Sequence, residues 1–405
     1  MKILFFTDHF TPEMSPPAAH IYDRCKIWVE QGHQVTVVTN VPNYPFGKTY
    51  KNYINKFRQV EILDGIRVVR VITYMAENKG TLKRILDYLS YTISAFINSL
   101  FMEKPDVVIS SSPPLFTPIV GVAFSILRGV PHVFEIRDLW PAFIAATNGW
   151  DKAGWMYRTL ECLELWLYKK SKRIITFSPT FTDDLVSRGV EVDKIDLVIN
   201  GSDLNLFSPK DPDQALLDEL GLNDQLVIGY IGTIGLAHDL KNAVRAAKLV
   251  EDKNITLLFV GAGGEKENVQ TLANELEAKN VIFIGRQEKK SVPRWWSICD
   301  VGLVHLKGSE ELAAAIPSKI FESMAMGKPV LFSGLPGAGS YIVNSHEAGV
   351  CVTANDPQSL AKAMIAMKTD KEHLAIYAAN SLASAPEYSR VKQAEKTLAS
   401  LTKVL

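Results

Sequence analysis

The segment IPSKIFESMAMGKPV, Ile316–Val330, is the part of the sequence that decides the fold class. Its pattern predicts a short helix that opens just after Pro317 and carries Lys319 and Glu322. Gly327 ends this helix, and the next proline leads into a buried strand, as in an α/β fold. The free N–H groups and positive dipole of a helix start suit a diphosphate, and a carboxylate one turn further on can bind the paired hydroxyls of a ribose. The segment therefore indicates chemistry on a nucleotide sugar.

The same alternation of strand and helix runs along the whole chain. Apolar strands at residues 2–7 and 35–39 flank a helical pattern at about 18–31, and this βαβ unit predicts a parallel sheet covered on both faces. A second series begins with a strand at 226–231, and the two series meet near 207–212, a segment with two prolines. We therefore predict two Rossmann-like α/β domains that face each other across a cleft, with ligands at the carboxyl ends of the strands.

The predicted domains differ in their expected ligands. Residues 1–206 form the first domain, which is expected to bind the acceptor. Residues 207–389 form the second, which is expected to bind the nucleotide-sugar donor. A last helical pattern at about 390–405 is expected to pack back on the first domain.

Length and composition indicate a globular protein of more than one domain. The 405 residues are enough for two or three domains, and 47% hydrophobic with 22% charged residues argues against disorder. Lys+Arg and Asp+Glu both total 44, so we expect no nucleic-acid partner. The four cysteines are scattered without a CxxC pair, so neither a disulfide framework nor a zinc site is expected.

The sequence predicts neither a signal peptide nor a membrane span. Asp8 and His9 interrupt the apolar start of the chain, which therefore indicates a first buried strand and lacks the core of a signal peptide. No uninterrupted apolar run reaches the roughly 18 residues that a spanning helix needs. We expect a cytoplasmic protein, with the inner face of the cell membrane as a further possible location.

Three motifs carry a family resemblance that covers nearly the whole chain. They are GHQVTVVT at residues 32–39, INGSDLNLF at 199–207 and FESMAMGKPV at 321–330. In this order and spacing they resemble the retaining glycosyltransferases of the GT-B fold in the large family-4 group. A narrower resemblance, to bacterial O-antigen and capsule transferases of N-acetylated amino sugars such as fucosamine, rests on PNYP at 42–45, RDLWP at 137–141 and PSK at 317–319.

The resemblance assigns the donor helix its roles. The glutamate that matches Glu322 binds the ribose of the sugar nucleotide in that family, although a solvated helix glutamate is the alternative. At the helix start, the ammonium of Lys319 and the free N–H groups could hold the diphosphate as it becomes the leaving group, although an ordinary surface lysine is the alternative. Ser318 is assigned to donor binding. Most members carry a second glutamate eight positions before the first, and that position is Ala314 here. This departure favours an amino or deoxy sugar over a plain hexose, unless a nearby loop glutamate substitutes.

Four further residues are predicted to bind the donor. Gly232 and Thr233 follow a strand, and their small size allows a phosphate to approach the backbone, although a plain turn explains them equally well. Lys241 and an arginine often flank this loop in the family, and Thr233 takes the arginine position here. Arg286 follows the strand at 281–284, where it could contact the diphosphate or the base, or serve only as a loop arginine.

The first domain is predicted to hold the acceptor. Asp138 follows the strand at 133–136, where it could orient or deprotonate an acceptor hydroxyl and is assigned as catalytic with Lys319. Arg137 is assigned to the acceptor, but it could instead hold Asp138 in a salt bridge. Ser15 and Pro16 replace the paired glycines that the family has in its first loop, and both are predicted to contact the acceptor.

One segment suggests a membrane surface. Residues 82–101 are apolar and aromatic with a basic start, so they could lie on a bilayer and receive a lipid-linked acceptor. The alternative is an ordinary helix packed on its sheet.

These inferences predict an enzyme. We expect a glycosyltransferase that moves a sugar, an N-acetylated amino or deoxy sugar, from a nucleotide diphosphate donor such as a UDP-sugar to a lipid-linked polysaccharide precursor. The resemblance implies retention of configuration. No convincing DxD motif occurs, so we expect no metal and no other cofactor. A nucleotide-sugar epimerase and a non-catalytic sugar-nucleotide binder are the alternatives.

Overall fold

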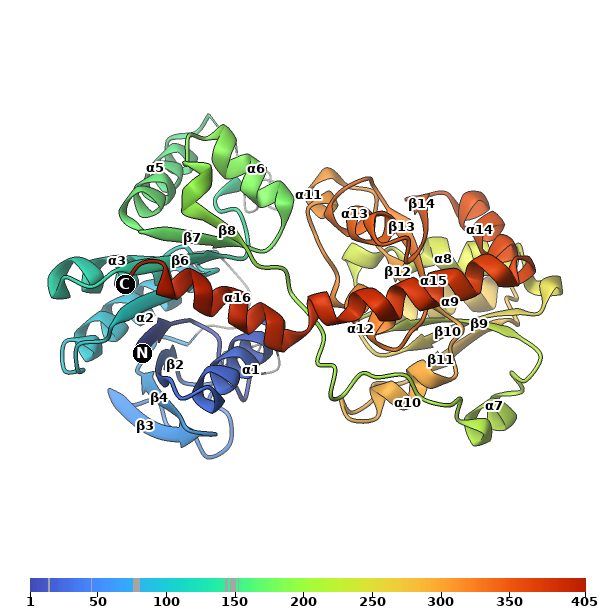
Figure 1. Ribbon diagram of the computed structural model, residues 1–405, viewed down its shortest axis with the longest axis horizontal. Helices are drawn as coiled ribbons and strands as arrows, with labels where there is room; N and C mark the ends of the chain where they lie inside the picture. The colour runs from blue at the N-terminus through green and yellow to red at the C-terminus, as the bar shows by residue number, and fades with distance from the viewer. Residues whose placement is uncertain (14, 45, 76–80, 143–144, 146–150, 152) are drawn as a thin grey trace. The chain divides into compact units, whose positions relative to one another are not determined.

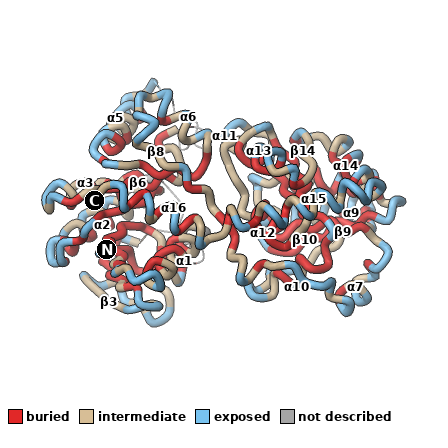
Figure 2. The backbone as a smooth tube through the Cα atoms, in the orientation of Figure 1, coloured by how far each residue is buried: buried red, intermediate tan, exposed pale blue. Residues whose placement is uncertain are grey.

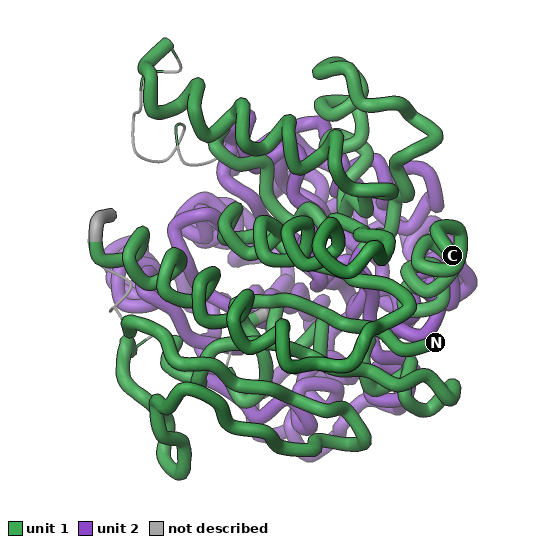
Figure 3. The backbone as a smooth tube through the Cα atoms, turned by 90° about the vertical axis from the view of Figure 1, so that its left-hand side faces the viewer, with its two compact units in different colours: residues 1–199, 393–405 green, residues 200–392 purple. Residues whose placement is uncertain are grey.

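The computed structural model of the protein contains two compact α/β units (Figures 1 and 3). It describes the chain except residues 14, 45, 76–80, 143–144, 146–150 and 152. Unit 1 comprises Met1–Ile199 with Gln393–Leu405, and unit 2 comprises Asn200–Lys392. The prediction of two α/β domains with parallel sheets is confirmed.

Unit 1 is built on an eight-stranded sheet in the order β3-β4-β2-β1-β5-β6-β7-β8. Among the strands that the structure describes in this sheet, β3 and β4 pair antiparallel and all other neighbours pair parallel. The strand order reverses between β1 and β5, and Phe6 of β1 pairs with Val38 on one side and Ser110 on the other. The strands are β1 (Lys2–Phe6), β2 (Gln34–Asn40), β3 (Arg58–Leu63), β4 (Ile66–Val71), β5 (Val107–Ser112), β6 (His132–Ile136), β7 (Arg173–Thr176) and β8 (Ile195–Leu197).

Helices cover both faces of this sheet. The described helices are α1 (Pro16–Glu30), α2 (Thr81–Ser99), α3 (Thr117–Arg128), α5 (Trp155–Lys170), α6 (Pro179–Ser187) and α16 (Arg390–Thr402). One core cluster joins α1 and α16 to the sheet, and two others join α2 and α3, and α5 and α6, to it. Along β1 and β2, apolar side chains alternate between the cluster that contains α1 and α16 and the cluster that contains α2 and α3. This alternation is expected for a sheet that is buried on both faces.

The last helix completes unit 1 from the far end of the sequence. The Trp28 indole N–H donates to the Ala394 carbonyl at 2.9 Å, and an Arg24 guanidinium N–H donates to Thr397 Oγ1 at 3.2 Å. Lys403 Nζ lies 2.7 Å from Asp196 Oδ1. Leu401 is fully buried in the same cluster as Trp28. The first and last segments of the chain therefore share one hydrophobic core.

Unit 2 is built on a six-stranded, wholly parallel sheet in the order β11-β10-β9-β12-β13-β14. Continuous apolar runs make its central strands, because both faces are covered, and all six residues of β9 and of β10 are buried. Figure 2 shows β9 and β10 largely buried, while the helices around them alternate between buried and exposed residues. The strands are β9 (Leu226–Ile231), β10 (Ile255–Val260), β11 (Val281–Ile284), β12 (Val301–His305), β13 (Val330–Gly334) and β14 (Gly349–Thr353).

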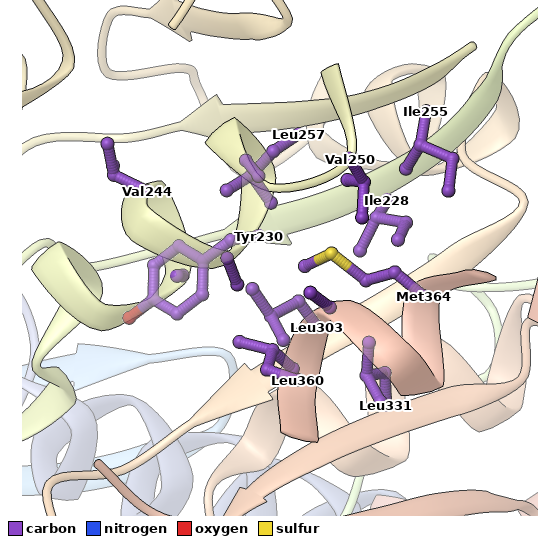
Figure 4. Close-up of a cluster of buried hydrophobic side chains, with 14 of the residues drawn as sticks. Ile228, Tyr230, Val244, Val250, Ile255, Leu257, Leu303, Leu331, Leu360 and Met364 are labelled. Carbon is purple, nitrogen blue, oxygen red and sulfur yellow. The ribbon is translucent and has the colours of Figure 1, made fainter. Parts of the chain in front are cut away.

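The core of unit 2 lies between this sheet and its helices (Figure 4). Ile228, Tyr230 and Leu303 contribute from the strands, and Leu360 and Met364 contribute from a helix. The helices are α7 (Gln214–Leu220), α8 (Leu240–Lys248), α9 (Lys266–Glu275), α10 (Val292–Ser297), α11 (Glu310–Ala313), α12 (Ser318–Ala325), α13 (Ala338–Ser345), α14 (Pro357–Thr369) and α15 (Lys371–Ser384).

The compact units divide at slightly different positions from the predicted domains. The prediction placed the boundaries after residues 206 and 389, whereas the units divide after Ile199 and Lys392. Hydrogen bonds explain the difference, because Ser202 N–H donates to the Tyr388 carbonyl and Arg390 N–H donates to the Ser202 carbonyl, each at 2.9 Å. This pairing attaches residues 200–206 to unit 2.

Candidate active site

The carboxyl ends of β9 and β12 mark the candidate donor site of unit 2. These neighbouring strands lie where the strand order reverses, and α/β sheets bind ligands at such a switch point. β9 ends at Ile231 and leads into Gly232, while β12 ends at His305. The short helix α12 follows soon after β12.

Close backbone packing holds α12 against β12. A Cβ atom at Gly302 would lie 2.1 Å from the Ser323 hydroxyl, so only glycine allows this approach. The helix buries Ile320, Phe321 and Met324 and directs Lys319 toward β9. Lys319 Nζ lies 4.7 Å from the centre of the Tyr230 ring, and it would lie 3.0 Å from a Cβ at Gly232. The structure thus brings Lys319 to the glycine loop.

Lys319 is a buried cation. Its side chain is about 8% exposed, and among the described residues no carboxylate lies within ion-pair distance of its Nζ. Burial lowers the pKa of Lys319 to about 8, although the charge of Glu322 opposes this shift. A buried charge without an ion-pair partner is costly, so a bound anion would complement this site.

Glu322 lies one turn further along α12 and is half-buried. Burial raises its pKa above the usual value, while Lys319, Arg390, the Trp296 indole and Lys289 act to lower it. The charges of Glu322 and Lys319 interact, because each acts on the pKa of the other. The pair could therefore bind a ligand that carries both negative charge and hydroxyl donors.

The loop after β9 is shaped by glycine. Gly232 has φ 140°, a conformation that side chains rarely adopt, and its N–H donates to the Val260 carbonyl at 2.8 Å. A Cβ at Gly261 would lie 1.9 Å from the Gly232 carbonyl, so the loops after β9 and β10 touch through their backbones. The Tyr230 hydroxyl donates to the Thr233 carbonyl at 2.6 Å, and Thr233 itself is exposed. These contacts account for the turn and leave the phosphate role of Gly232 and Thr233 a prediction.

Two histidines that the sequence analysis did not single out also belong to this site. His305 lies between the carbonyl oxygen of His238 (2.7 Å from Nδ1) and the Asn242 amide (3.0 Å from Nε2), so it fastens the glycine loop to β12. Burial lowers the pKa of His305 to about 4, and burial with the Lys319 charge does the same for His238. Both rings are therefore neutral at pH 7. The pairing of β9 with β12, which sequence patterns do not give, brings His305 to the loop that carries His238.

The other residues predicted to bind the donor are spread over several elements of unit 2. Ser318 is the first residue of α12, and Lys241 lies half-buried in the first turn of α8, close in sequence to the glycine loop. Arg286 is exposed after the edge strand β11, with β10 between that strand and β9. Ala314 caps the end of α11 and is half-buried. Their ligand-binding roles remain predictions.

In unit 1, Arg137 has a structural partner. Its Nε lies 2.8 Å from a Glu135 carboxylate oxygen and 3.1 Å from the Ser111 hydroxyl, and its guanidinium stacks 4.5 Å from the Phe177 ring centre. Arg24 from α1 pairs with the same buried glutamate. Arg137 therefore belongs to a buried ion-pair network, which offers a structural explanation beside its predicted acceptor role.

Asp138 follows Arg137 just beyond the end of β6 and is half-buried. Burial raises its pKa, and the neighbouring Arg137 charge opposes the shift. Ser15 caps α1, where its hydroxyl accepts from the Ala18 N–H at 3.4 Å, and Pro16 is the first residue of that helix. A helix cap accounts for Ser15, and the acceptor roles of all these residues remain predictions.

Both halves of the chain match families of known proteins. Residues 17–201 match the glycosyl transferase 4-like domain, and residues 213–382 match the glycosyl transferases group 1. The chain is a glycosyltransferase. Its two matched segments fall almost entirely in units 1 and 2, respectively.

Individual proteins agree with this assignment. The glycosyltransferase is 27% identical to WcaI of Escherichia coli K12, a colanic acid biosynthesis glycosyl transferase, over 81% of this chain and 82% of that protein. It is 29% identical to TuaH of Bacillus subtilis 168, a teichuronic acid biosynthesis glycosyltransferase, over half of each chain. Its fold matches Anabaena HepE in complex with UDP at a TM-score of 0.73 and 17% identity, with both chains fully covered.

The glycosyltransferase also has a buried acidic cluster in unit 1 that the sequence analysis missed. Asp8 and His9 follow β1, at the switch point of that sheet. His9 Nδ1 lies 2.8 Å from a carboxylate oxygen of Glu13, whose other oxygen accepts the N–H groups of Asn43 and Tyr44, each at 2.9 Å. Burial raises the pKa of Asp8 to about 6, and contact with Glu13 and Asp8 raises that of His9.

Proposed function

We propose that this glycosyltransferase moves an N-acetylated amino or deoxy sugar from a UDP donor to a lipid-linked polysaccharide precursor, with retention of configuration. The observation that carries the proposal is the buried Lys319 ammonium, which has no ion-pair partner among the described residues and lies against Gly232 at the switch point of unit 2. An anion at this place would be a ligand, because ligands of such sheets bind at that edge.

Unit 2 would hold the donor. The diphosphate would lie on Lys319 and the first turn of α12, and Glu322 would accept hydrogen bonds from the ribose hydroxyls. When the bond between the anomeric carbon and the phosphate oxygen breaks, negative charge grows on the departing diphosphate. Its attraction to Lys319 then strengthens, which lowers the barrier because the interaction is strongest in the transition state.

Unit 1 would bind the acceptor. The acceptor hydroxyl oxygen forms the new bond to the anomeric carbon, and its proton must leave. Asp138 is our proposed partner for this hydroxyl, because burial raises its pKa and so favours uptake of a proton. We propose that Lys319 and the α12 amides carry the diphosphate charge without a metal ion. UDP binding should therefore be the same with and without EDTA, as measured by calorimetry.

The identity of the substrates rests on the relatives and on one departure. HepE was solved with UDP and with UDP-glucose, which supports a UDP donor. WcaI and TuaH are named for the biosynthesis of colanic and teichuronic acid, which supports a polysaccharide precursor as acceptor. Ala314, in place of the glutamate that would contact sugar hydroxyls, favours the amino or deoxy sugar.

A donor screen tests the proposal. Purified protein is incubated with UDP-glucose, UDP-N-acetylglucosamine and UDP-N-acetylfucosamine together with lipid-linked acceptors, and products are identified by mass spectrometry. We expect transfer from an N-acetylated donor and its loss in Lys319→Met. Lys362→Met, on an exposed position of α14, is the matched control and should retain activity. Full turnover by Lys319→Met would overturn the site assignment.

A further inference from the structure

Helix α2 of unit 1 has two apolar faces. One face, with Tyr91 and Ala95, is fully buried against the sheet. The other exposes a stripe of aliphatic side chains at helical spacing, from Leu86 and Leu89 to Ile93, which is 61% exposed, and Ile97. Since the first face already anchors the helix, the second is not needed to fold unit 1.

The stripe continues beyond α2. Leu100 and Phe101 follow directly, and Phe101 is 69% exposed. The end of α3 lies beside them, because an Arg128 guanidinium N–H donates to the Leu100 carbonyl at 2.8 Å, and this end exposes two more aliphatic side chains. We call this surface the apolar face. Its members are Leu86, Leu89, Ile93, Ile97, Leu100, Phe101, Ile126 and Leu127.

An open groove borders the apolar face. It has a volume of about 460 Å³ and lies between α2 and the segments around β3 and β4. Phe57, Ile72 and Tyr74 line it on one side, and Ile93 and Ile97 of the apolar face line it on the other. A groove of this size and lining could admit one lipid chain, which a flat protein partner would not fill.

The charges around the apolar face indicate what covers it. Lys83 and Arg84 are exposed at the start of α2. Shortly after its end Lys104 is exposed beside the exposed acid Glu103, whose charge is offset by an ion pair with Lys2 at 3.0 Å. The only acid within α2 is Asp87, which is half-buried. A stripe of Leu, Ile and Phe that begins beside two exposed cations, Lys83 and Arg84, is the pattern of a helix that lies in the interface of a bilayer with anionic lipids.

We propose that the apolar face docks on the surface of a membrane that contains anionic lipids. The cations would contact the lipid head groups while the aliphatic stripe enters the boundary between head groups and chains. Among the helices that the structure describes, none is long and apolar enough to cross a bilayer, so the contact would be peripheral. The inference rests on the proposed function in one respect, since docking would place unit 1 beside the lipid-linked acceptor.

Vesicle sedimentation tests this inference without a known acceptor. The full chain is mixed with vesicles of phosphatidylcholine alone or with phosphatidylglycerol, and bound protein is measured in the pellet. We expect binding to the anionic vesicles that weakens several-fold as salt is raised, because exposed charges are screened. Protein that stays in the supernatant with both vesicle types would overturn the proposal.

Variants locate the contact. Ile93→Asp should reduce vesicle binding about tenfold or more, because it places a charge in the middle of the stripe. Ile376→Asp, at a 44% exposed isoleucine on α15, is the matched control and should bind as the parent does. Thermal unfolding of both variants checks that they fold. Equal vesicle binding by Ile93→Asp and the parent would contradict the inference.

Two further measurements distinguish membrane docking from a protein interface and from an effect of the donor site. Gel filtration with light scattering shows whether Ile93→Asp changes the oligomeric state; a parent dimer that the variant dissolves, without vesicle binding, would make the apolar face a protein interface and refute the proposal. UDP binding should be unchanged in Ile93→Asp, because Lys319 lies in unit 2. Vesicle binding that persists when Lys319→Met abolishes UDP binding would support membrane docking independently of the donor site.

Discussion

The two units of this glycosyltransferase use one topology with opposite charge. The sheet of unit 2 is parallel and that of unit 1 is parallel apart from the β3–β4 edge pair, and each places ionisable side chains where its strand order reverses. In unit 2 the central group is the buried cation Lys319, whereas in unit 1 it is the pair of buried acids Asp8 and Glu13. The reversal of strand order thus brings ionisable groups together in both units, a buried cation in one and buried acids in the other.

The surfaces of the units differ as well. Unit 2 exposes large apolar side chains singly, at scattered positions along its sequence. Among the described residues, unit 1 exposes more of them, and eight lie on α2, directly after it or at the end of α3. Single exposed apolar residues are normal in soluble proteins, but a contiguous group indicates a partner. The described residues of unit 2 that belong to this class are Leu236, Leu249, Tyr341, Ile376, Leu382 and Val391.

Removing the buried cation of unit 2 should have the largest effect of the changes considered, on both UDP binding and stability. Lys319→Met should weaken UDP binding about 100-fold or more, because it leaves the diphosphate without its charged partner. The same change should raise the free energy of unfolding by about 1–3 kcal/mol at pH 7, since it removes a buried charge. Calorimetry and thermal unfolding measure the two effects. Weaker UDP binding with lower stability would mean that Lys319 is a structural residue.

The pH dependence of UDP binding should follow the same lysine. The pKa of Lys319 is lowered to about 8, so the ammonium loses its proton as pH rises through that value. UDP affinity should fall about tenfold between pH 7 and pH 9, since the fraction of Lys319 that carries a proton falls about tenfold over this range. Stability should rise over the window from pH 8 to the ordinary lysine pKa, because the unfolded chain there binds more protons. Lys319→Arg should make UDP affinity independent of pH in this range.

A change at Glu322 tests whether this carboxylate binds the ribose hydroxyls. Glu322→Gln should weaken UDP binding about fivefold, because a charged acceptor of hydroxyl hydrogen bonds becomes a neutral one. Binding of 2′,3′-dideoxy-UDP should hardly change, since it lacks the hydroxyls. Titrations of both ligands with both proteins form a double-mutant cycle. An equal loss for the two ligands would place Glu322 elsewhere than at the ribose.

The acids of unit 1 should show the opposite pH behaviour at a smaller scale. Burial raises the folded-state pKa of Asp8 to about 6, so stability falls as pH rises from 4 to 6, where the folded protein binds more protons. Asp8→Asn should therefore raise the free energy of unfolding by about 1–2 kcal/mol at pH 8 and by little at pH 4. Denaturant unfolding at both pH values measures this, with the exposed Asp183→Asn as control. A destabilised Asp8→Asn at pH 8 would show that its charge is needed for the fold.

The sequence predicts the fold well because its strands are continuous apolar runs between helices. It also places Lys319 and Glu322 on one short helix, because their spacing and the flanking proline and glycine are local signals. The contact of Lys319 with Gly232 is not local, and only the order of strands β9 and β12 creates it.

The unit 1 cluster was missed for a related reason. In the sequence, Asp8 and His9 only interrupt an apolar run. Their partner Glu13 is held by the N–H groups of Asn43 and Tyr44, which lie some thirty residues later in the chain. In α2, periodicity reports apolar residues on two faces and cannot tell which face packs on the sheet. Both cases need contacts between segments that a local pattern does not contain.

The way in which α16 completes unit 1 has a consequence for biosynthesis. Trp28 and Arg24 find their hydrogen-bond partners at Ala394 and Thr397, which the ribosome adds only after the whole of unit 2 has been made. Unit 2 is contiguous in sequence and can close its core while it emerges. Unit 1 is mostly synthesised first, but it cannot complete its hydrophobic core until α16 has been made, which happens after the whole of unit 2.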